Sequence, residues 1–283
     1  MMIILSGMRI AIFGDVHGNL PALEALVNDL EISRPDHVIC LGDIIDGFGD
    51  SRACVDLIRE MRPTITVLGN AEWRVREWPT STQTMRPESV PVFRQMIDEL
   101  SDGAQLYLSQ LPIVATFDPG ESDAPTLLAF HGQPDEPFAG IRLPREEWPA
   151  SWASKNCEFM HLDEERMSRS LASMTGDPAT PRWLVCGHTH VRMVRRWQST
   201  TATSLTIINP GPLAFGDYFN GGRLDAHYAL LDADSEDGWR ITWRTLDYDK
   251  RAAAESIDRL SAVTPFMARV RAQLRAEARS SHR

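Results

Sequence analysis

Seven side chains of the types that bind metal ions lie at the ends of short apolar runs in this chain. They comprise two aspartates, one asparagine and four histidines, namely Asp15, His17, Asp43, Asn70, His131, His188 and His190. Imidazole, carboxylate and amide ligands together suit borderline divalent metals such as manganese, iron, zinc or nickel. The set is large enough for two ions, so the sequence predicts a site for two divalent metal ions, with manganese as the first choice.

The spacing of these residues supports a shared site. Alternate residues of an extended segment point the same way, so Asp15 with His17, and His188 with His190, can each converge on one point. Each residue also has an ordinary structural explanation when taken alone. Asp15 could cap the helix that follows, and Asp43 could be an acid in a turn. The recurrence of such residues in five segments, each at a predicted strand end, favours the metal site.

The elements that would position these residues form a repeating pattern of strand, turn and helix. Strands are predicted at "MRIAIF", "HVICLG" and "TITVLG", and helices at "NLPALEALVNDL" and "DSRACVDLIREM". The strands are apolar on both faces, which is typical of a parallel sheet covered by helices. In α/β sheets of this kind ligands bind at the carboxyl ends of the strands, where Asp15, Asp43 and Asn70 lie.

The rest of the chain is predicted to contribute a second set of strands and three further segments. Strands at "PIVATF" and "TLLAFHG" are expected to pair. The successive strands "RWLVCGHTH", "VRMVRRW", "LTIINPG", "AHYALLDA" and "WRITWRTL" are expected to form much of a second sheet. Residues 72–110 are predicted to be mostly helical, residues 133–180 to form an insertion near the active site, and residues 249–283 to form a C-terminal helix. We expect residues 1–283 to form a single domain.

Charge and cysteine content exclude several classes of protein. The net charge of −10 and the pI of about 5.3 argue against a general affinity for nucleic acid or anionic membranes. No apolar run reaches the length of a membrane-spanning helix. The four cysteines form no CxxC pair, which indicates reduced thiols and a cytoplasmic location.

The ordered motifs "GDVHGN", "LGDIIDGFGD", "LGNAEW", "FHG" and "CGHTH" resemble those of the calcineurin-like metallophosphoesterases. The segment "INPGPL", followed by "HYALLDAD", resembles the bacterial phosphodiesterase branch of that superfamily. The resemblance runs from Met8 to about Asp234. It implies an α/β fold, a four-layer αββα sandwich of two mixed sheets, here with a helical insertion and a C-terminal helix.

The resemblance also implies how the ligands divide between two ions. One ion would be held by Asp15, His17 and His190, the other by Asn70, His131 and His188, and Asp43 would bridge both, so that Asp43, Asn70 and His131 count among the catalytic residues. Paired ions in such sites lie roughly 3.5–4 Å apart and lower the pKa of a water between them to about 7. The hydroxide would attack phosphorus in line, while the ions offset charge on the phosphoryl oxygens.

One motif departs from the family pattern. The third motif usually reads Gly-Asn-His followed by an acid, whereas here it reads Gly69-Asn70-Ala71-Glu72. In the family that histidine helps protonate the leaving group or steadies the phosphate, so its absence favours phosphodiesters and activated leaving groups. Glu72 could substitute for it, or could open the following helix, where an acid suits the helix dipole. Trp73 is the candidate for a substrate-facing aromatic residue, the alternative being that it packs against the body of the domain.

The sequence therefore predicts a metal-dependent phosphodiesterase that acts on a small or nucleotide-like phosphoester, with no membrane partner and no nucleic-acid partner. The first alternative is a phosphomonoesterase or a Ser/Thr-type protein phosphatase. It is weakened because no arginine lies between Asp43 and Arg52, where the family's protein phosphatases carry one. The second alternative is a non-catalytic scaffold that retains the fold, and it is weakened because no ligand is lost.

Overall fold

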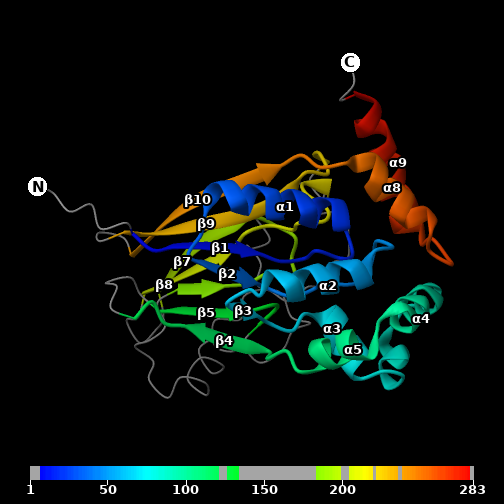
Figure 1. Cartoon of the computed structure of the whole chain (residues 1–283), viewed down its shortest axis with the longest axis horizontal. Helices are drawn as coiled ribbons and strands as arrows, with labels where there is room; N and C mark the ends of the chain where they lie inside the picture. The colour runs from blue at the N-terminus through cyan, green and yellow to red at the C-terminus, as the bar shows by residue number, and fades with distance from the viewer. Residues whose placement is uncertain are drawn as a thin grey trace, which may run out of the picture.

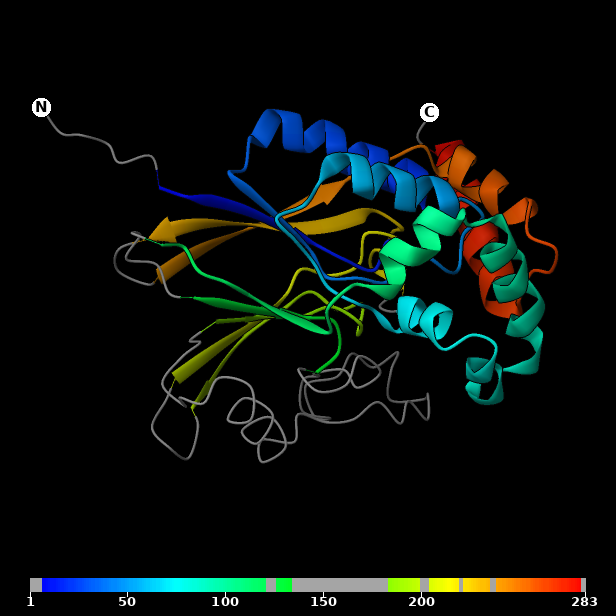
Figure 2. The same cartoon turned by 60° about the horizontal axis from the view of Figure 1, so that its bottom comes forward.

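The structure of the chain is a computed structural model that describes residues 7–120, 126–133, 183–198, 204–218, 221–234 and 238–280. Its strands form two mixed sheets of five, ordered β10-β9-β1-β2-β3 and β4-β5-β6-β8-β7. Figure 2 shows the sheets as two stacked layers, with helices α1 and α2 over the outer face of the first. This is the α/β arrangement of two mixed sheets expected from the sequence.

The first sheet begins with the predicted strand–helix repeat. Its parallel strands are β1 (Arg9–Phe13), β2 (His37–Cys40) and the short β3 (Ile65–Thr66), and its helices are α1 (Leu20–Ser33) and α2 (Ser51–Met61). Ala11 and Phe13 of β1 are fully buried in one apolar cluster with Leu23 and Leu26 of α1. Successive strand residues point to opposite faces, so the alternate residues of β1 are free to pack on the second sheet.

The last two strands belong to the first sheet, and the expectation that they extend the second sheet is wrong. β9 (Ala226–Asp234) pairs antiparallel with β1, and β10 (Gly238–Leu246) pairs antiparallel with β9. Ile10 of β1 lies opposite Leu231 of β9. Strand residues alone show that a segment is extended, but they do not say which neighbour it pairs with. Here the chain crosses back from the second sheet before β9 begins.

The second sheet contains β4 (Val114–Phe117), β5 (Leu127–Phe130), β6 (Trp183–Val185), β7 (Met193–Gln198) and β8 (Ser204–Asn209). Strands β5, β6 and β8 are parallel, whereas β4 and β7 are antiparallel to their neighbours. A buried apolar cluster joins the two sheets, with Ile12 and Ile39 from the first sheet and Ala129, Val185 and Ile208 from the second.

Helices gather at the end of the molecule toward which β1 runs (Figure 1). They are α3 (Asn70–Arg76), α4 (Val90–Glu99), α5 (Asp102–Ser109), α8 (Lys250–Asp258) and α9 (Pro265–Ser280), with short 3-10 turns at Thr80–Thr84 and Pro87–Ser89. The C-terminal region thus forms two helices rather than one. The predicted insertion at residues 133–180 lies outside the described residues apart from Gln133.

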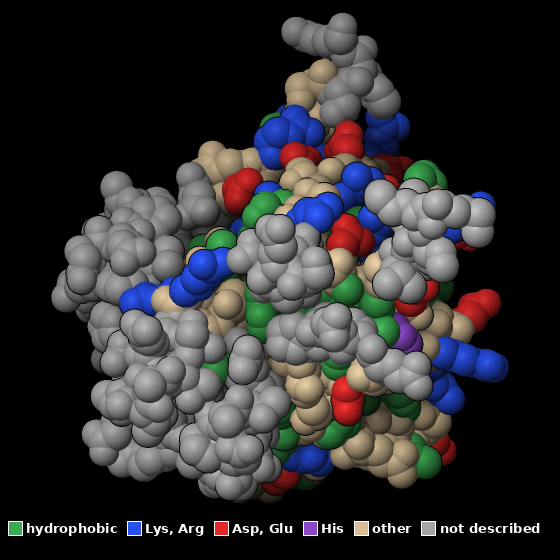
Figure 3. All heavy atoms as spheres, turned by 90° about the vertical axis from the view of Figure 1, so that its left-hand side faces the viewer, with side chains coloured by type: hydrophobic (Ala, Val, Ile, Leu, Met, Phe, Trp, Pro, Cys, Tyr) green, Lys and Arg blue, Asp and Glu red, His purple; other side chains and the backbone are tan. Residues whose placement is uncertain are grey.

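None of the described helices combines the length and the apolarity that crossing a bilayer requires. Cys40, Cys54 and Cys186 are buried free thiols, and Cys157 lies outside the described residues. On the face seen in Figure 3, the coloured basic and acidic side chains are interspersed.

Candidate metal centre

The seven predicted ligands come together at the carboxyl ends of four strands and the start of α3. Asp15 and His17 follow β1, and Asp43 follows β2. Asn70 is the first residue of α3, His131 follows β5, and His188 and His190 follow β6. They divide into an outer group (Asp15, His17 and His190) and an inner group (Asp43, Asn70, His131 and His188). In each group the ligand atoms of the aspartate and the two histidines lie within 4.8 Å of one another.

The outer group is compact and slightly exposed. Nε2 of His17 lies 3.0 Å from Nε2 of His190, and Nε2 of His190 lies 3.3 Å from Oδ1 of Asp15. The side chains of His17 and His190 are 10% and 14% exposed, whereas Asp15 is fully buried. Two imidazoles and one carboxylate therefore converge on a point that solvent can reach.

The inner group is buried except at His188, which is partly exposed. His131 is fully buried, and its Nε2 lies 3.3 Å from Oδ2 of Asp43. Nδ1 of His131 lies 2.7 Å from the carbonyl oxygen of Leu41. Because that carbonyl only accepts, Nδ1 carries a proton there, and Nε2 is left as the atom that faces Asp43.

Asp43 lies between the two groups. Its Oδ2 is 3.3 Å from His131 Nε2 and 3.7 Å from His17 Nε2. Its other oxygen, Oδ1, accepts a hydrogen bond of 2.9 Å from the backbone N–H of Ala71. One carboxylate oxygen is thus fixed by the backbone and the other faces both groups.

Burial and mutual charge shift the protonation of the inner group. Burial disfavours the charged form of Asp43, but the nearby His131 outweighs it and holds the pKa of Asp43 far below its usual range. Burial also opposes protonation of His131, yet Asp43 raises the pKa of His131 to about 9. Burial and then the charge on His131 lower the pKa of His188 to about 3. A positive charge beside Asp43 is therefore favoured, whether it is a proton or a bound cation.

Five of the seven ligands have left-handed backbone conformations. The φ angles are 53° at Asp15, 49° at His17, 49° at Asp43, 67° at His188 and 56° at His190. Such angles in residues other than glycine cost of order 1–3 kcal/mol each and persist only when the surroundings enforce them. The loops after β1, β2 and β6 are thus held in conformations that aim ligands at one point.

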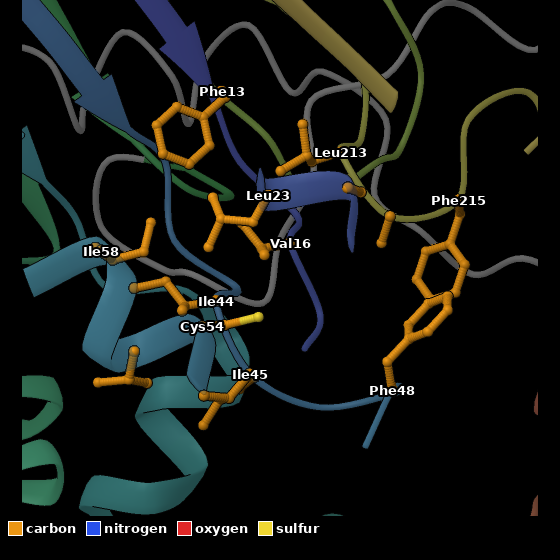
Figure 4. Packing of buried hydrophobic residues seen from close by; sticks show 14 of the residues in the cluster. Phe13, Val16, Leu23, Ile44, Ile45, Phe48, Cys54, Ile58, Leu213 and Phe215 are labelled. Carbon is orange, nitrogen blue, oxygen red and sulfur yellow. The ribbon is translucent and has the colours of Figure 1, made fainter. Parts of the chain in front are cut away.

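Apolar neighbours provide part of this enforcement. Val16, between Asp15 and His17, is fully buried, as are Ile44 and Ile45 after Asp43. Figure 4 shows these side chains packed toward α1 and α2. Backbone hydrogen bonds join the same loops, with the N–H of His17 donating to the carbonyl of Asp43 at 2.8 Å. The ligands therefore sit on loops whose other side chains form part of the core.

Glu72 fixes the loop that carries Asp43. Its carboxylate accepts hydrogen bonds from the backbone N–H groups of Asp43 and Ile44 (both 2.8 Å), Gly69 (2.9 Å) and Ile45 (3.3 Å). Burial, followed by the nearby Asp43, raises the pKa of Glu72 to about 7. Because Glu72 is fully buried and its oxygens are used in this way, it positions the site instead of replacing the missing histidine. The signal for this was its place three residues after Gly69, the spacing of a capping box.

Gly69 allows α3 to approach the loop after β2. A β-carbon at this position would lie 2.2 Å from the backbone nitrogen of Asp43 and 2.3 Å from its Oδ1. Gly42 has φ +83°, and a β-carbon there would lie 2.5 Å from the nitrogen of Gly69. The two glycines therefore interlock, and only glycine fits at either position.

A buried asparagine clamps the turn that carries His188 and His190. The side-chain amide of Asn209 donates to the carbonyl of Gly187 at 2.7 Å and to the hydroxyl of Thr189 at 3.1 Å. Asn209 is the "N" of the "INPGPL" motif, and its sequence context alone gives no sign of this role. Side chains that orient ligands in this way influence metal sites nearly as strongly as the ligands do.

Two predicted residues lie in different surroundings. Ala71 is fully buried and belongs to the main apolar cluster, so the position has no room for a larger side chain without repacking. Trp73 is partly buried against the same cluster, and the guanidinium of Arg76 lies 4.3 Å from its ring centre. A substrate-facing role for Trp73 stays a prediction.

A cavity of about 220 Å³ adjoins the outer group. His17 and His190 line it together with residues of α4, α9 and the loop between α8 and α9. The ring of Phe215 stacks on His190, with centroids 5.3 Å apart and an interplanar angle of 24°. The ring centres of Phe215 and His17 are 5.1 Å apart. No motif in the sequence marks this wall.

The donor set fits divalent cations. Oδ2 of Asp15 is buried and makes no hydrogen bond within the described part of the chain. One end of the Asn70 amide lies 2.7 Å from Nδ1 of His188 and 3.2 Å from Oδ2 of Asp43. If the amide oxygen is at that end, it faces His188 Nδ1 and Asp43 Oδ2, and a cation would stabilise these three electron-rich atoms. If the amide is turned, its N–H groups donate hydrogen bonds to them instead. Carboxylate, imidazole and amide donors are the set expected for manganese, iron, zinc or nickel.

Comparisons with known proteins agree with this geometry. Residues 8–192 match a protein family described as calcineurin-like phosphoesterase, and this stretch includes all seven ligands. An uncharacterized protein of Methanocaldococcus jannaschii is 38% identical over 66 residues, which are 23% of this chain and 27% of that protein. The chain therefore matches about a quarter of the length of this relative.

Two solved structures resemble the fold over most of the chain. A metallophosphoesterase from Sphaerobacter thermophilus has a TM-score of 0.66 and 22% identity, covering 95% of this chain and 99% of that one. A hypothetical protein from Pyrococcus horikoshii has a TM-score of 0.66 and 18% identity, covering 89% and 92%. At this level of identity the likeness concerns the fold. Helices α8 and α9 lie outside the stretch that the family matches.

Proposed function

Because the chain belongs to the calcineurin-like phosphoesterase family, we propose that it is a metal-dependent phosphodiesterase acting on a small or nucleotide-like substrate. One observation carries the proposal. The aspartate and two histidines of each group converge within 4.8 Å, and Asp43 faces both groups. A scaffold that had lost catalysis would have no need of two complete ligand groups held on strained loops.

The residues would divide the work as their positions suggest. Asp15, His17 and His190 would hold one ion, Asn70, His131 and His188 the other, and Asp43 would bridge them. When bound, two divalent cations, with manganese the first choice, would supply the Lewis acidity and the hydroxide for in-line attack on phosphorus. The carbonyl of Leu41 keeps Nε2 of His131 directed at Asp43. Glu72 would fix the conformation of the loop after β2, and Asn209 that of the loop after β6.

The preference for diesters rests on position 71. With alanine there, no imidazole beside Asn70 protonates the leaving group, and general acid catalysis is typically worth about 10²–10⁴ in rate. The rate should therefore depend steeply on the pKa of the leaving group, and activated aryl diesters should be better substrates than alkyl phosphomonoesters. The measurement is kcat/KM across a series of aryl phosphate diesters. A flat series would show that another group supplies the proton.

Because Ala71 is enclosed by the core, replacing it with histidine would disturb folding before it tested catalysis. The unmodified chain is therefore the right material for that series. The three described cysteines are free thiols, which supports our placement of the protein in a reducing compartment, the cytoplasm.

Metal analysis tests the proposal most directly. The purified protein should bind about two divalent ions per chain, and Asp43→Asn should lower kcat/KM by about 10³-fold or more because both ions lose several kcal/mol of charge stabilisation. The assay is elemental analysis, followed by activity on phosphodiesters, phosphomonoesters and a phosphopeptide with Mn²⁺, Fe²⁺, Zn²⁺ or Ni²⁺. The exposed Asp56→Asn on α2 is the matched control. Higher activity on monoesters or the phosphopeptide would favour a monoesterase or protein phosphatase, and binding of metal without any hydrolysis would favour a scaffold.

A further inference from the structure

The cavity beside the outer group has apolar and aromatic walls contributed by the C-terminal region. Phe266 and Met267 of α9 line it, as do Leu260 from the loop before α9 and Val92 of α4. Phe215 forms the wall nearest the ligands, and its ring centre lies 5.5 Å from that of Phe266. A substrate group that extends from the outer group into the cavity would therefore contact aromatic rings and aliphatic side chains, including those of α9.

The walls are fixed in place by hydrogen bonds between helices. The side-chain amide of Gln95 on α4 donates to the carbonyl of Arg259 at 3.2 Å, and its oxygen accepts from the N–H of Ser261 at 2.5 Å. The guanidinium of Arg259 donates to Asp50 at 2.5 Å, just before α2. The loop between α8 and α9 is thus tied to two other helices, which gives the cavity a preformed shape.

Size and charge restrict what the cavity can hold. Cavities that enclose a drug-sized ligand measure roughly 300–1,000 Å³, so a volume of about 220 Å³ suits one ring and not a dinucleotide. Among the described residues that line it, Asp46 brings a carboxylate, with Arg74 4.0 Å away. A second phosphate or a carboxylate would lose its hydration against the apolar walls, which disfavours a charged group there.

We propose that this cavity binds a flat, uncharged aromatic ring carried by the ester group of the substrate, so that α9 and the loop before it select the substrate. The proposal rests on the proposed function, because the phosphoryl group must lie at the metal centre for the ring to reach the cavity. It assigns specificity to residues outside the stretch that the family matches. Stacking on Phe215 and Phe266 would orient the ring.

Binding of two phosphonates to the metal-loaded protein tests this inference directly. Phenylphosphonate and methylphosphonate share the same anionic head and differ in the ring. Burial of a ring predicts that phenylphosphonate binds about 10- to 100-fold more tightly, measured by calorimetry. AMP against ribose 5-phosphate repeats the comparison with a nucleobase. A matching preference there identifies the ring as a nucleobase, and a preference limited to phenylphosphonate identifies it as another aryl group.

Replacing each of two alanines with phenylalanine tests whether the preference for phenylphosphonate arises in the cavity. Ala262→Phe fills the cavity, because Ala262 lines it, whereas Ala272→Phe makes the same change at an exposed position of α9. The preference for phenylphosphonate should fall to within about twofold in Ala262→Phe and stay unchanged in Ala272→Phe. Equal affinities for the two phosphonates in the parent protein, or an undiminished preference in a folded Ala262→Phe, would overturn the inference.

Kinetics separate this inference from the proposed function. Methyl and phenyl p-nitrophenyl phosphate release the same leaving group and differ in the retained ester group. The inference predicts a higher kcat/KM for the phenyl diester. Ala262→Phe should remove that advantage, whereas Ala272→Phe, outside the cavity, should leave kcat/KM on both diesters unchanged. Hydrolysis of both diesters at equal rates, with equal phosphonate affinities, overturns the cavity assignment alone. Phosphonate discrimination without hydrolysis of either diester overturns the phosphodiesterase and leaves the ring site standing.

Discussion

The inner and outer ligand groups use the same kinds of side chain in different surroundings. His131 of the inner group is fully buried, and its two nitrogens face Leu41 and Asp43. His190 of the outer group is partly exposed, stacks on Phe215 and lines a cavity. The difference suggests a division in which the inner group holds its ion permanently, while the outer group presents its ion to the substrate. The experiments below test that division, beginning with the largest expected effect.

Removing one histidine from each group should weaken binding of the two ions, and lower kcat/KM, to different extents. His131→Ala removes a fully buried candidate ligand from the inner group, and loss of that ion's charge stabilisation should lower kcat/KM by about 10³-fold. His190→Ala should lower kcat/KM by only about 10- to 100-fold, because water can reach the vacated position and replace the lost ligand. Activity is measured against Mn²⁺ concentration and with added imidazole.

Recovery of activity on adding imidazole and Mn²⁺ distinguishes His131→Ala from His190→Ala more sharply than the loss of activity does. Imidazole and excess Mn²⁺ should restore part of the activity of His190→Ala, since the cavity opens beside it, and should not restore His131→Ala. His37→Ala, at the start of β2, is the control for loss of a histidine outside the site. Equal rescue of both variants would mean that the two groups exchange their ions alike.

Changing the residue that positions the inner group should give an intermediate effect. In Glu72→Gln one carboxylate oxygen becomes an amide nitrogen, which cannot accept hydrogen bonds. Depending on which oxygen is replaced, the loop loses either the bonds from the N–H groups of Asp43 and Gly69 or those from Ile44 and Ile45. We expect metal affinity and kcat/KM to fall by about 10- to 100-fold. Glu77→Gln, at the exposed end of α3, is the matched control. A loss of thermal stability with unchanged metal affinity would contradict the positioning role.

The smallest effect on activity should come from a buried carboxylate outside both groups. Asp29 of α1 accepts hydrogen bonds from Tyr228 and, at 2.6 Å, from Arg244. Burial opposes its charge, but these bonds hold the pKa of Asp29 below its ordinary value of 3.8. The stabilisation is therefore complete above that ordinary value and is lost as the pH falls through the lower folded value.

Asp29→Asn should accordingly lower the free energy of unfolding by about 1–3 kcal/mol at pH 7 and leave kcat/KM unchanged. The difference from the parent protein should shrink as urea titrations are repeated toward pH 3. Asp56→Asn, whose side chain is 49% exposed in a surface pair, should change stability by less than about 1 kcal/mol. A drop in activity on Asp29→Asn would show that the ligand loops depend on this distant sheet edge.

The convergence of the seven candidate ligands could be predicted from the sequence because each follows an apolar run, and strand ends at one edge of a sheet lie together. That these residues bind metal stays a prediction. The pairing of β9 with β1 could not, because an alternating apolar pattern does not identify the neighbouring strand. Glu72 carried a readable signal in its capping-box spacing from Gly69, although its reach to the loop after β2 depends on tertiary packing.

Phe215 and the C-terminal wall could not be predicted at all from local pattern. Phe215 lies in a loop after β8, and the amphipathic pattern of α9 shows that one face is buried without showing what it covers. The left-handed backbone of five candidate ligands was hidden for a similar reason. Aspartate and histidine can adopt both ordinary and left-handed conformations, and only the surrounding contacts select one.

The hydrogen bonds from Leu213 to the carbonyl of Gly14 and from Ala214 to the carbonyl of Asp15, each 3.0 Å, link the first strand loop to a segment made much later in synthesis. On the ribosome, Asp15 and His17 emerge long before the residues that lock their loop and before His188 and His190 exist. Contacts between such distant parts of a chain form slowly. The candidate metal centre therefore cannot be complete until the chain has been made as far as His190, and its first loop is not locked until Leu213 and Ala214 follow.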